Sequence, residues 1–308
     1  MDITVSPDSK QEVKFLHKYL RAIGFSKLTD RKELQKLLTD IVVNGTDRAY
    51  TSNGEKTLLA EFSKDFAEGM GIAVCGEFDE DDKFTYDYYY PYLRGNIISS
   101  EEDVSVERHA AQESYAGVCD DIKVGVTLIF YLQNMIPYVK ANNMGVLPIR
   151  GTTLTLSALS SQGSIMLPIM KTEKDLIKNK RAFMTRAQLI DAARKGDEEA
   201  IENLTLEDMD TYTAISKRIQ KEDVFSLVDT YFMPYGIECD HYSILAEIVE
   251  CNLVRNKLTE EEIYVMTLNC NNLIFEMCIN KEDLYGEPAA GRRFKGIIWM
   301  QGFINFPN

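Results

Sequence analysis

The sequence predicts an α+β fold built from two pseudo-repeated halves, in which each half is a helical segment followed by an antiparallel β-sheet. Apolar residues recur first at helical spacing and then at the alternating spacing of strands, and this order occurs twice along the 308 residues. A stretch in each half, residues 100–121 and 259–280, also aligns without a gap. We therefore expect two domains, one over residues 1–170 and one over residues 171–308.

The first half opens with three predicted helices. Residues 9–23 and 31–44 carry apolar side chains at helical spacing, and Gly24 and Gly45 follow them where helices commonly end. Residues 56–68 show the same spacing and stop at a Gly-Met-Gly sequence. That sequence would lead from a helix into a strand, the reverse of the order in a dinucleotide-binding turn, so we do not expect it to hold a phosphate.

The rest of the first half is predicted to form strands, because apolar residues alternate with polar ones or run continuously. Pro168 indicates an edge strand, since proline cannot donate to a neighbouring strand. The acidic residues 79–82 are expected to be a solvated hairpin tip, because they lack the glycine and terminal glutamate of a calcium loop. The predicted strands are 72–78, 84–92, a hairpin at 103–120, 124–131, 153–159 and 165–169.

Helices return in the second half. Thr185 and Gln188 form a capping box for a helix that ends at Gly196, and a second helix is expected at about residues 205–221. Strands follow again, as the period of the apolar residues changes back to two. The predicted strands of this half are 224–234, 243–254, 262–270, 273–279 and 293–305.

The internal repeat rests on the two aligned hairpins. Asn271 and Asn272 suit a two-residue type I′ turn in the second hairpin, since asparagine tolerates a positive φ. A glycine followed by an apolar strand comes after both hairpins, with about a dozen extra residues before it in the second copy. The aligned pairs include Glu101 with Glu260, Glu102 with Glu261, Val106 with Val265, and Cys119 with Cys278.

Charge and cysteine content limit the classes of partner. The chain has 48 Asp and Glu against 34 Lys and Arg, a formal net charge of −14, so we do not expect it to bind nucleic acid, whose phosphates require clustered basic residues. No stretch reaches the roughly 18 apolar residues of a membrane helix, so we expect no membrane association. The six cysteines form no Cys-x-x-Cys pair, which indicates free thiols in a reducing cytoplasm.

Four phrases of the sequence are distinctive, and they lie in residues 17–25 (HKYLRAIGF), 115–121 (YAGVCDD), 232–238 (FMPYGIE) and 286–302 (GEPAAGRRFKGIIWMQG). In these phrases the chain resembles an uncharacterised bacterial family, a domain of unknown function of about this length. The resemblance covers essentially the whole chain. It implies no activity, ligand, cofactor or catalytic residue.

The best candidate for a ligand site is the loop from Gly286 to Gly296. It is an insertion relative to the first half, and it gathers Arg292, Arg293 and Lys295 within a strongly acidic chain. A glycine-rich, locally basic loop suits an anionic ligand or an acidic partner. The alternative is that Arg292 and Arg293 pair with carboxylates of the protein itself.

Two further groups of residues have side chains that could bind a metal or act as a nucleophile, but their spacing or surroundings do not match such a site. Cys239, His241 and Cys251 are too few and too loosely spaced for zinc, which needs about four ligands, so we expect no metal and no cofactor. His109 and Cys119 would face each other across the first predicted hairpin. Their surroundings are acidic, which opposes formation of a thiolate, so we do not expect a nucleophile there.

No constellation of residues in the sequence supports a chemical reaction. We therefore expect a non-enzymatic cytoplasmic binding or scaffold protein that contacts a partner protein. The alternative is an enzyme or small-ligand binder that recognises an anionic ligand through Arg292, Arg293 and Lys295.

Overall fold

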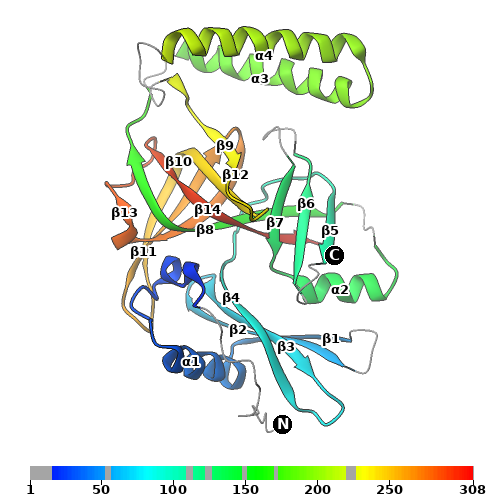
Figure 1. Ribbon diagram of the computed structural model, residues 1–308, viewed down its shortest axis with the longest axis vertical. Helices are drawn as coiled ribbons and strands as arrows, with labels where there is room; N and C mark the ends of the chain where they lie inside the picture. Colours follow the sequence, from blue (N-terminus) through cyan, green and yellow to red (C-terminus); the bar gives the residue numbers. More distant parts are fainter. Residues whose placement is uncertain are drawn as a thin grey trace.

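The structure is a computed structural model, and it shows a protein made mainly of β-strands, with 47% of residues in strands and 24% in helices (Figure 1). The expected α+β class with two helix-plus-sheet halves is therefore wrong. Two helices of 22 residues each lie together at one end of the molecule, away from the sheets, as Figure 1 shows. The described residues are 16–52, 57–108, 114–121, 127–147, 151–169, 173–219 and 227–307.

The N-terminal part forms a four-stranded antiparallel sheet, with its strands in chain order. The 3-10 helix η1 (Lys18–Ile23) precedes it, and the helix α1 (Arg31–Asn44), capped by the Asp30 side chain, packs on β2 and β3. The strands are β1 (Asp47–Ser52), β2 (Leu58–Ala67), β3 (Met70–Phe78) and β4 (Phe84–Leu93).

The C-terminal part contains a closed five-stranded barrel. Its strands follow the order β8-β12-β11-β10-β14, and β14 pairs back with β8 to close the ring. The contact between β8 and β12 is parallel, and the other contacts of the ring are antiparallel. The strands are β8 (Thr153–Met166), β10 (His241–Arg255), β11 (Glu262–Cys270), β12 (Leu273–Asn280) and β14 (Arg293–Asn305).

Smaller elements extend the barrel. The end of β14 pairs with β7, and β6 and β5 continue the sheet beyond it, while β9 pairs with β10 and β13 pairs with β8. These elements are β5 (Val104–Arg108), β6 (Tyr115–Cys119), β7 (Leu128–Leu132), α2 (Met135–Asn143), β9 (Tyr231–Pro234), η2 (Lys281–Asp283) and β13 (Leu284–Tyr285).

Side chains fill the interior of the barrel. Phe294 is fully buried, and glycines on β8 and β14 make room for its ring: a Cβ added at Gly163 or Gly296 would lie 2.3 or 2.6 Å from that ring. Phe130 on β7 lies in the same way over Gly117 and Gly302. The glycines are therefore required by close packing, and the barrel is a hydrophobic core.

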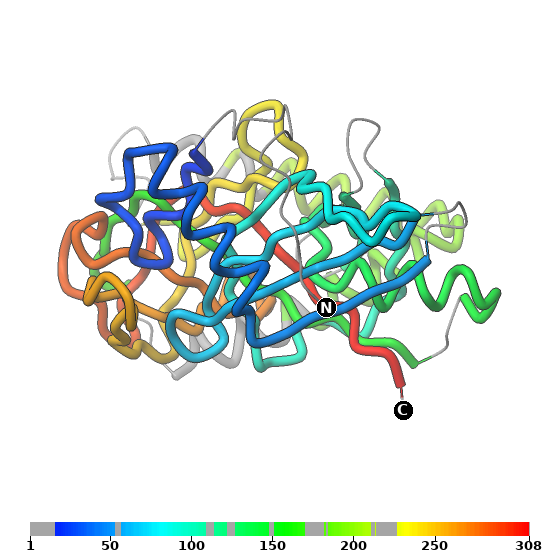
Figure 2. The backbone as a smooth tube through the Cα atoms, turned by 90° about the horizontal axis from the view of Figure 1, so that it is seen from below, coloured from blue at the N-terminus to red at the C-terminus, as the bar shows by residue number. Residues whose placement is uncertain are grey.

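A second core joins the four-stranded sheet to the barrel. Figure 2 shows the N-terminal elements, in blue to cyan, lying across the barrel strands. Tyr90 on β4 meets Tyr131 on β7 with ring centroids 4.7 Å apart. Buried amides tie the two parts together, because Gln133 Nε2 donates to Leu93 O at 2.9 Å and to Gln301 Oε1 at 2.7 Å. The two parts therefore share one continuous buried region.

The remaining helices form a hairpin at the end of the molecule opposite the four-stranded sheet (Figure 1). They are α3 (Glu173–Arg194) and α4 (Glu198–Ile219), and they come in the chain between the barrel strands β8 and β9. Each packs mainly on the other, and neither packs substantially on another helix or strand of the described chain. None of the described helices is long and apolar enough to span a membrane.

The predicted repeat does not describe the architecture. Both aligned segments do form antiparallel hairpins, but β11–β12 lies within the barrel ring, whereas β5–β6 lies at the edge of the extended sheet. The registers differ as well: Val104 pairs with Cys119, but the aligned Ile263 pairs with Asn280. Short amphipathic hairpins resemble one another whatever sheet they join, which explains the alignment.

Individual elements also differ from the prediction. Residues 56–68 were expected to be a helix, but they lie mainly in β2, which contacts α1 and α2 and has buried residues on both faces. A strand buried on both faces shows no alternation. The barrel takes β8 from before residue 170 and its other strands from after it, so the expected domain boundary falls between strands of one sheet. Part of the predicted strand 224–234 lies outside the described residues.

Candidate functional site

The arginines of the predicted cationic loop bind backbone carbonyls within the protein. Gly286 and Gly291, with φ of 94° and 82°, shape the turn between β13 and β14. Arg292 Nη1 donates to the backbone carbonyl of Glu287 at 2.6 Å. The partner is a backbone carbonyl of the same loop, and not a carboxylate as the alternative interpretation had expected.

Arg293 joins three segments of the chain. It begins β14 and is 5% exposed. Its Nε donates to Leu167 O at 3.0 Å, and its Nη1 donates to Val228 O at 2.9 Å and to Asp229 O at 3.4 Å. Burial lowers the pKa of the guanidinium, and the nearby Asp229 acts in the opposite direction. Arg293 thus holds together the end of β8 and the start of β9, where the chain leaves for the α3–α4 hairpin and returns from it.

Lys295 shares a side of β14 with Arg293, because the inward-facing Phe294 stands between them and side chains alternate along a strand. Lys295 is half-buried. Arg292, Arg293 and Lys295 are thus near neighbours in the chain. The guanidinium N–H groups of Arg292 and Arg293 donate to backbone carbonyls of the protein.

The α3–α4 hairpin exposes large apolar side chains to solvent. Met184, Leu206 and Met209 are 55%, 54% and 62% exposed. The two helices also differ in charge: α3 has six Lys or Arg and three Asp or Glu, whereas α4 has two Lys or Arg and six Asp or Glu. Arg186 joins the helices, with its Nη2 2.8 Å from Asp208 Oδ1.

Two helices were predicted in this region, but the expected capping box is wrong, because α3 begins at Glu173 and both Thr185 and Gln188 lie inside it. The sequence also did not indicate that the helices leave the body of the protein.

His241 belongs to a buried polar cluster. Its Nδ1 lies 2.8 Å from Asp240 Oδ1, and Trp299 Nε1 donates to Asp240 Oδ2 at 2.7 Å. Burial of Asp240 acts to raise its pKa, but the hydrogen bonds from His241 and Trp299 outweigh it and hold the pKa below its usual value. Cys239 is exposed, and the described residues contain no group of three or more side chains placed to hold a metal ion.

Aromatic rings cover this cluster on the side of η1. The rings of His17 and Tyr19 lie 4.8 and 5.5 Å from that of Trp299. Burial, followed by the charge of Lys18, lowers the pKa of His17 to about 4, so the ring is neutral at physiological pH. The cluster fastens the start of the described chain to the barrel. Its members are far apart in the sequence, and the sequence therefore did not reveal it.

Cys119 is buried and lacks the setting of a nucleophile. Burial raises its pKa to about 11, and its Sγ lies 3.9 Å from Ser100 Oγ, which donates to Asp121 Oδ2 at 2.6 Å. His109, the expected base, lies outside the described residues. At the tip of the β3–β4 hairpin, Asp79 Oδ1 accepts hydrogen bonds from the backbone N–H groups of Asp81 and Lys83, as in an ordinary turn.

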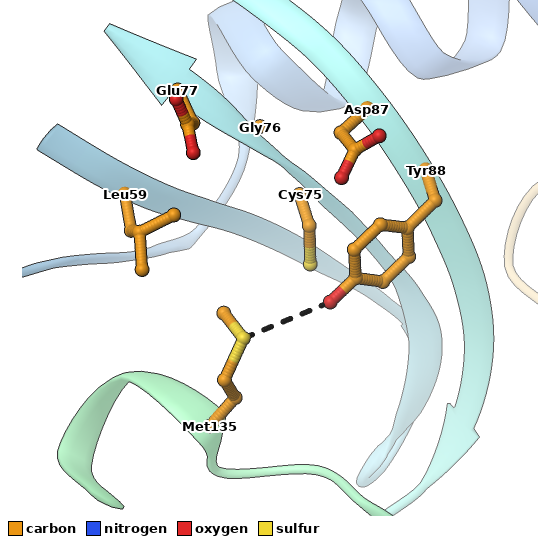
Figure 3. A pocket seen from close by; sticks show the side chains of 7 residues that line it. All are labelled: Leu59, Cys75, Gly76, Glu77, Asp87, Tyr88 and Met135. Carbon is orange, nitrogen blue, oxygen red and sulfur yellow. Dashed lines mark hydrogen bonds between the residues drawn. The ribbon is translucent and has the colours of Figure 1, made fainter. Parts of the chain in front are cut away.

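A small pocket opens between the four-stranded sheet and α2 (Figure 3). Its volume of ≈ 10 Å³ leaves room for about one water molecule. Figure 3 shows Cys75 and Tyr88 pointing into it, and the Tyr88 hydroxyl donates to Met135 Sδ at 3.8 Å. Burial, and next the charge of Glu61, raises the pKa of Cys75, so the thiol stays protonated and is a poor nucleophile.

Glu61 contacts Cys75 of this pocket and is a carboxyl group with a raised pKa. It pairs with Cys75 across β2 and β3, and its Oε2 accepts hydrogen bonds from Cys75 Sγ at 3.6 Å and from the Tyr90 hydroxyl at 3.2 Å. Burial raises its pKa to about 7, although these hydrogen bonds and the charge of Arg94 act in the opposite direction. No pattern in the sequence indicated this site, because residue 61 was predicted to lie in a helix.

Comparison with known proteins assigns the chain to a family without adding an activity. The family described as "Domain of unknown function, E. rectale Gene description (DUF3881)" matches residues 20–302. No curated protein and no solved structure matches the chain. The match covers nearly the whole sequence, and it confirms the resemblance to an uncharacterised bacterial family. The chain belongs to the DUF3881 family.

Proposed function

We propose that the protein is a non-enzymatic binding or scaffold protein of the cytoplasm, and that the α3–α4 hairpin is the element that contacts a partner protein. The observation that carries this proposal is the placement of the hairpin. Two helices of 22 residues each, about 33 Å long, project from the barrel and pack mainly on each other. Such an element leaves most of its surface available to a partner.

The surface of the hairpin supports contact with a protein. Exposed methionines such as Met184 and Met209 adapt their shape to a partner and are common in binding surfaces. The excess of basic residues on α3 and of acidic residues on α4 would orient a partner of complementary charge. All six cysteines are free thiols, in keeping with a reducing compartment.

Excision of the hairpin tests the proposal. Leu167 and Val228 both accept hydrogen bonds from Arg293, at 3.0 and 2.9 Å, so a short Gly/Ser linker can replace residues 171–226. We expect the shortened protein to keep its β-type circular dichroism and its cooperative thermal unfolding, because the barrel and the four-stranded sheet are untouched. We also expect a partner purified with the full chain to lose measurable affinity for the shortened one.

Point variants provide the matched control. Met184→Asp and Met209→Asp should weaken binding of that purified partner at least tenfold in calorimetry, whereas Ile98→Asp should leave it unchanged, because Ile98 is similarly exposed but lies outside the hairpin. Equal affinity for the full and the shortened protein would show that the partner binds elsewhere. Turnover of a substrate by the purified protein would contradict a non-enzymatic role.

A second proposal is that Arg292 and Lys295, two of the three predicted residues, recognise a small anionic ligand, while Arg293 between them is buried and bound to backbone carbonyls. It is supported by the partial exposure of Arg292 and Lys295 beside a glycine-shaped loop. A specific anion at 100 times its dissociation constant would stabilise the protein by about 2.7 kcal/mol. Thermal unfolding with inorganic phosphate and with nucleotides measures this, with Arg292→Ala as the variant that should lose the effect. A flat response in both proteins would exclude the site.

A further inference from the structure

The hydroxyl of Tyr90 lies between the two parts of the molecule and within reach of two acceptors. Glu61 Oε2, on β2 of the four-stranded sheet, is 3.2 Å from it, and the backbone carbonyl of Gln133, just after β7, is 3.1 Å from it. Tyr90 itself is 4% exposed. One buried hydroxyl group therefore faces one acceptor on each side of the joint.

A tyrosine hydroxyl has a single hydrogen, so it donates to one of these acceptors at a time. When Glu61 is ionised, its carboxylate only accepts and is the stronger acceptor, so Tyr90 donates to Glu61. When Glu61 is protonated, its own O–H donates to the Tyr90 oxygen, and Tyr90 then donates to Gln133 O. The protonation of Glu61 thus decides which side of the joint receives the hydrogen bond.

We propose that Glu61 is a proton-controlled switch for the contact between the four-stranded sheet and the barrel. In the protonated state a continuous chain of hydrogen bonds runs from Glu61 through Tyr90 to Gln133. In the ionised state the hydrogen bond from Tyr90 to Gln133 O is lost, and the Tyr90 hydroxyl donates only to Glu61, within the four-stranded sheet. The proton is exchanged with solvent water, and no other reactant is required.

Gln133 is well placed to transmit the change. Its backbone N–H donates to Gly302 O at 2.9 Å, and its side-chain amide donates to Leu93 O and Gln301 Oε1. Gln301 Nε2 in turn donates to Pro91 O at 2.8 Å on β4. A bond gained or lost at Gln133 therefore acts on a buried network that joins β4, β7 and β14.

The surroundings of Glu61 allow the switch to work near neutral pH. Cys75 on β3 and Tyr131 on β7 stay protonated, because burial raises the pKa of both groups. Arg94, after β4, is the cation whose charge acts on Glu61, and Asp87 acts on the neighbouring Cys75. Ala49 on β1 pairs opposite Glu61, and α2 contributes Met135 to the adjoining pocket, so these two elements add no charge there.

Amide hydrogen exchange measured by NMR tests the switch in the full chain. For a carboxyl with a pKa near 7, the protonated fraction falls from about 0.9 at pH 6 to about 0.1 at pH 8. We expect the exchange rate of the Gln133 amide, corrected for the intrinsic effect of pH, to rise severalfold and by at most about ninefold over this range. Glu61→Gln should exchange slowly at both pH values, because a neutral amide can donate to Tyr90 throughout.

Two further variants make the test decisive. Tyr90→Phe removes the bridging hydroxyl, and it should exchange fast at both pH values. Glu68→Gln removes an exposed carboxylate of the same sheet, and it should behave as the wild-type protein does. The proposal is overturned if the corrected wild-type rate is the same at pH 6 and pH 8, or if Glu61→Gln keeps the wild-type pH dependence. If Glu61→Gln does not fold, a wild-type pH dependence in Tyr90→Phe overturns it equally.

Discussion

The barrel strands contact one another around a complete ring, whereas the helices of the α3–α4 hairpin contact mainly each other. The barrel interior is fully buried and is filled by interlocking aromatic rings and glycines. The hairpin exposes methionine, leucine and isoleucine side chains and is joined to the barrel beside a single buried arginine. One region is thus stabilised by its own packing, and the other depends on its attachment.

This difference is the reason for our proposal that the hairpin, and not the barrel, contacts a partner. Strands that share a core cannot move or accept a partner without loss of packing. A helical pair outside the core can bind, bend or be removed with little effect on the rest. The contact at Tyr90 stands between these extremes, because it is buried but polar, and we propose above that it responds to a proton.

The largest expected effect distinguishes the two regions directly. Phe294→Ala should destabilise the protein by about 3–5 kcal/mol, because it leaves a cavity among residues that cannot collapse into it. Met209→Ala in the hairpin should change the free energy of unfolding by less than about 0.5 kcal/mol, because Met209 is largely exposed. Urea unfolding of both variants measures the difference. Similar values for the two would show that the hairpin belongs to the cooperative core.

A smaller effect is expected at the attachment of the hairpin. Arg293→Gln should lower the free energy of unfolding by about 2–3 kcal/mol, since it removes charged, partly buried hydrogen bonds to Leu167 O and Val228 O. Arg292→Gln is the matched control and should cost less than about 1 kcal/mol, because Arg292 donates to an exposed loop. Urea unfolding and proteolysis at the ends of the hairpin measure both. Equal losses of unfolding free energy in the two variants would mean that Arg293 does not attach the hairpin to the barrel.

Local structure was predicted well where the sequence carries its own signal. The helix at 31–44 and the strands at 262–270 and 293–305 have the predicted bounds, because a cap or turn residue marks their ends. Asn271 and Asn272 both have positive φ, 53° and 66°, as the type I′ turn requires. These features depend on neighbours in the chain and are visible in it.

The closure of the barrel and the candidate sites could not be predicted from the sequence, for physical reasons. The pairing of β8 with β14 joins residues more than a hundred positions apart, and no local pattern records it. Gln133 and Gln301 are buried although glutamine is usually exposed, so nothing indicated that they form the joint. Arg293 was identified by its charge, but its environment is a set of backbone carbonyls, which have no sequence signature.

The smallest effect concerns the ion pair within the hairpin. Arg186→Ala removes contacts to Glu207 and Asp208 at 3.5 and 2.8 Å, in which all three side chains are well exposed. We expect a loss of at most about 0.5 kcal/mol, since solvent and salt screen such pairs. Thermal unfolding of the wild-type protein and of Arg186→Ala in low and high salt measures it, with Lys195→Ala as a control at another exposed pair. A loss above about 1.5 kcal/mol would show that the two helices depend on this pair, and that the hairpin is a rigid element whose shape is fixed before any partner arrives.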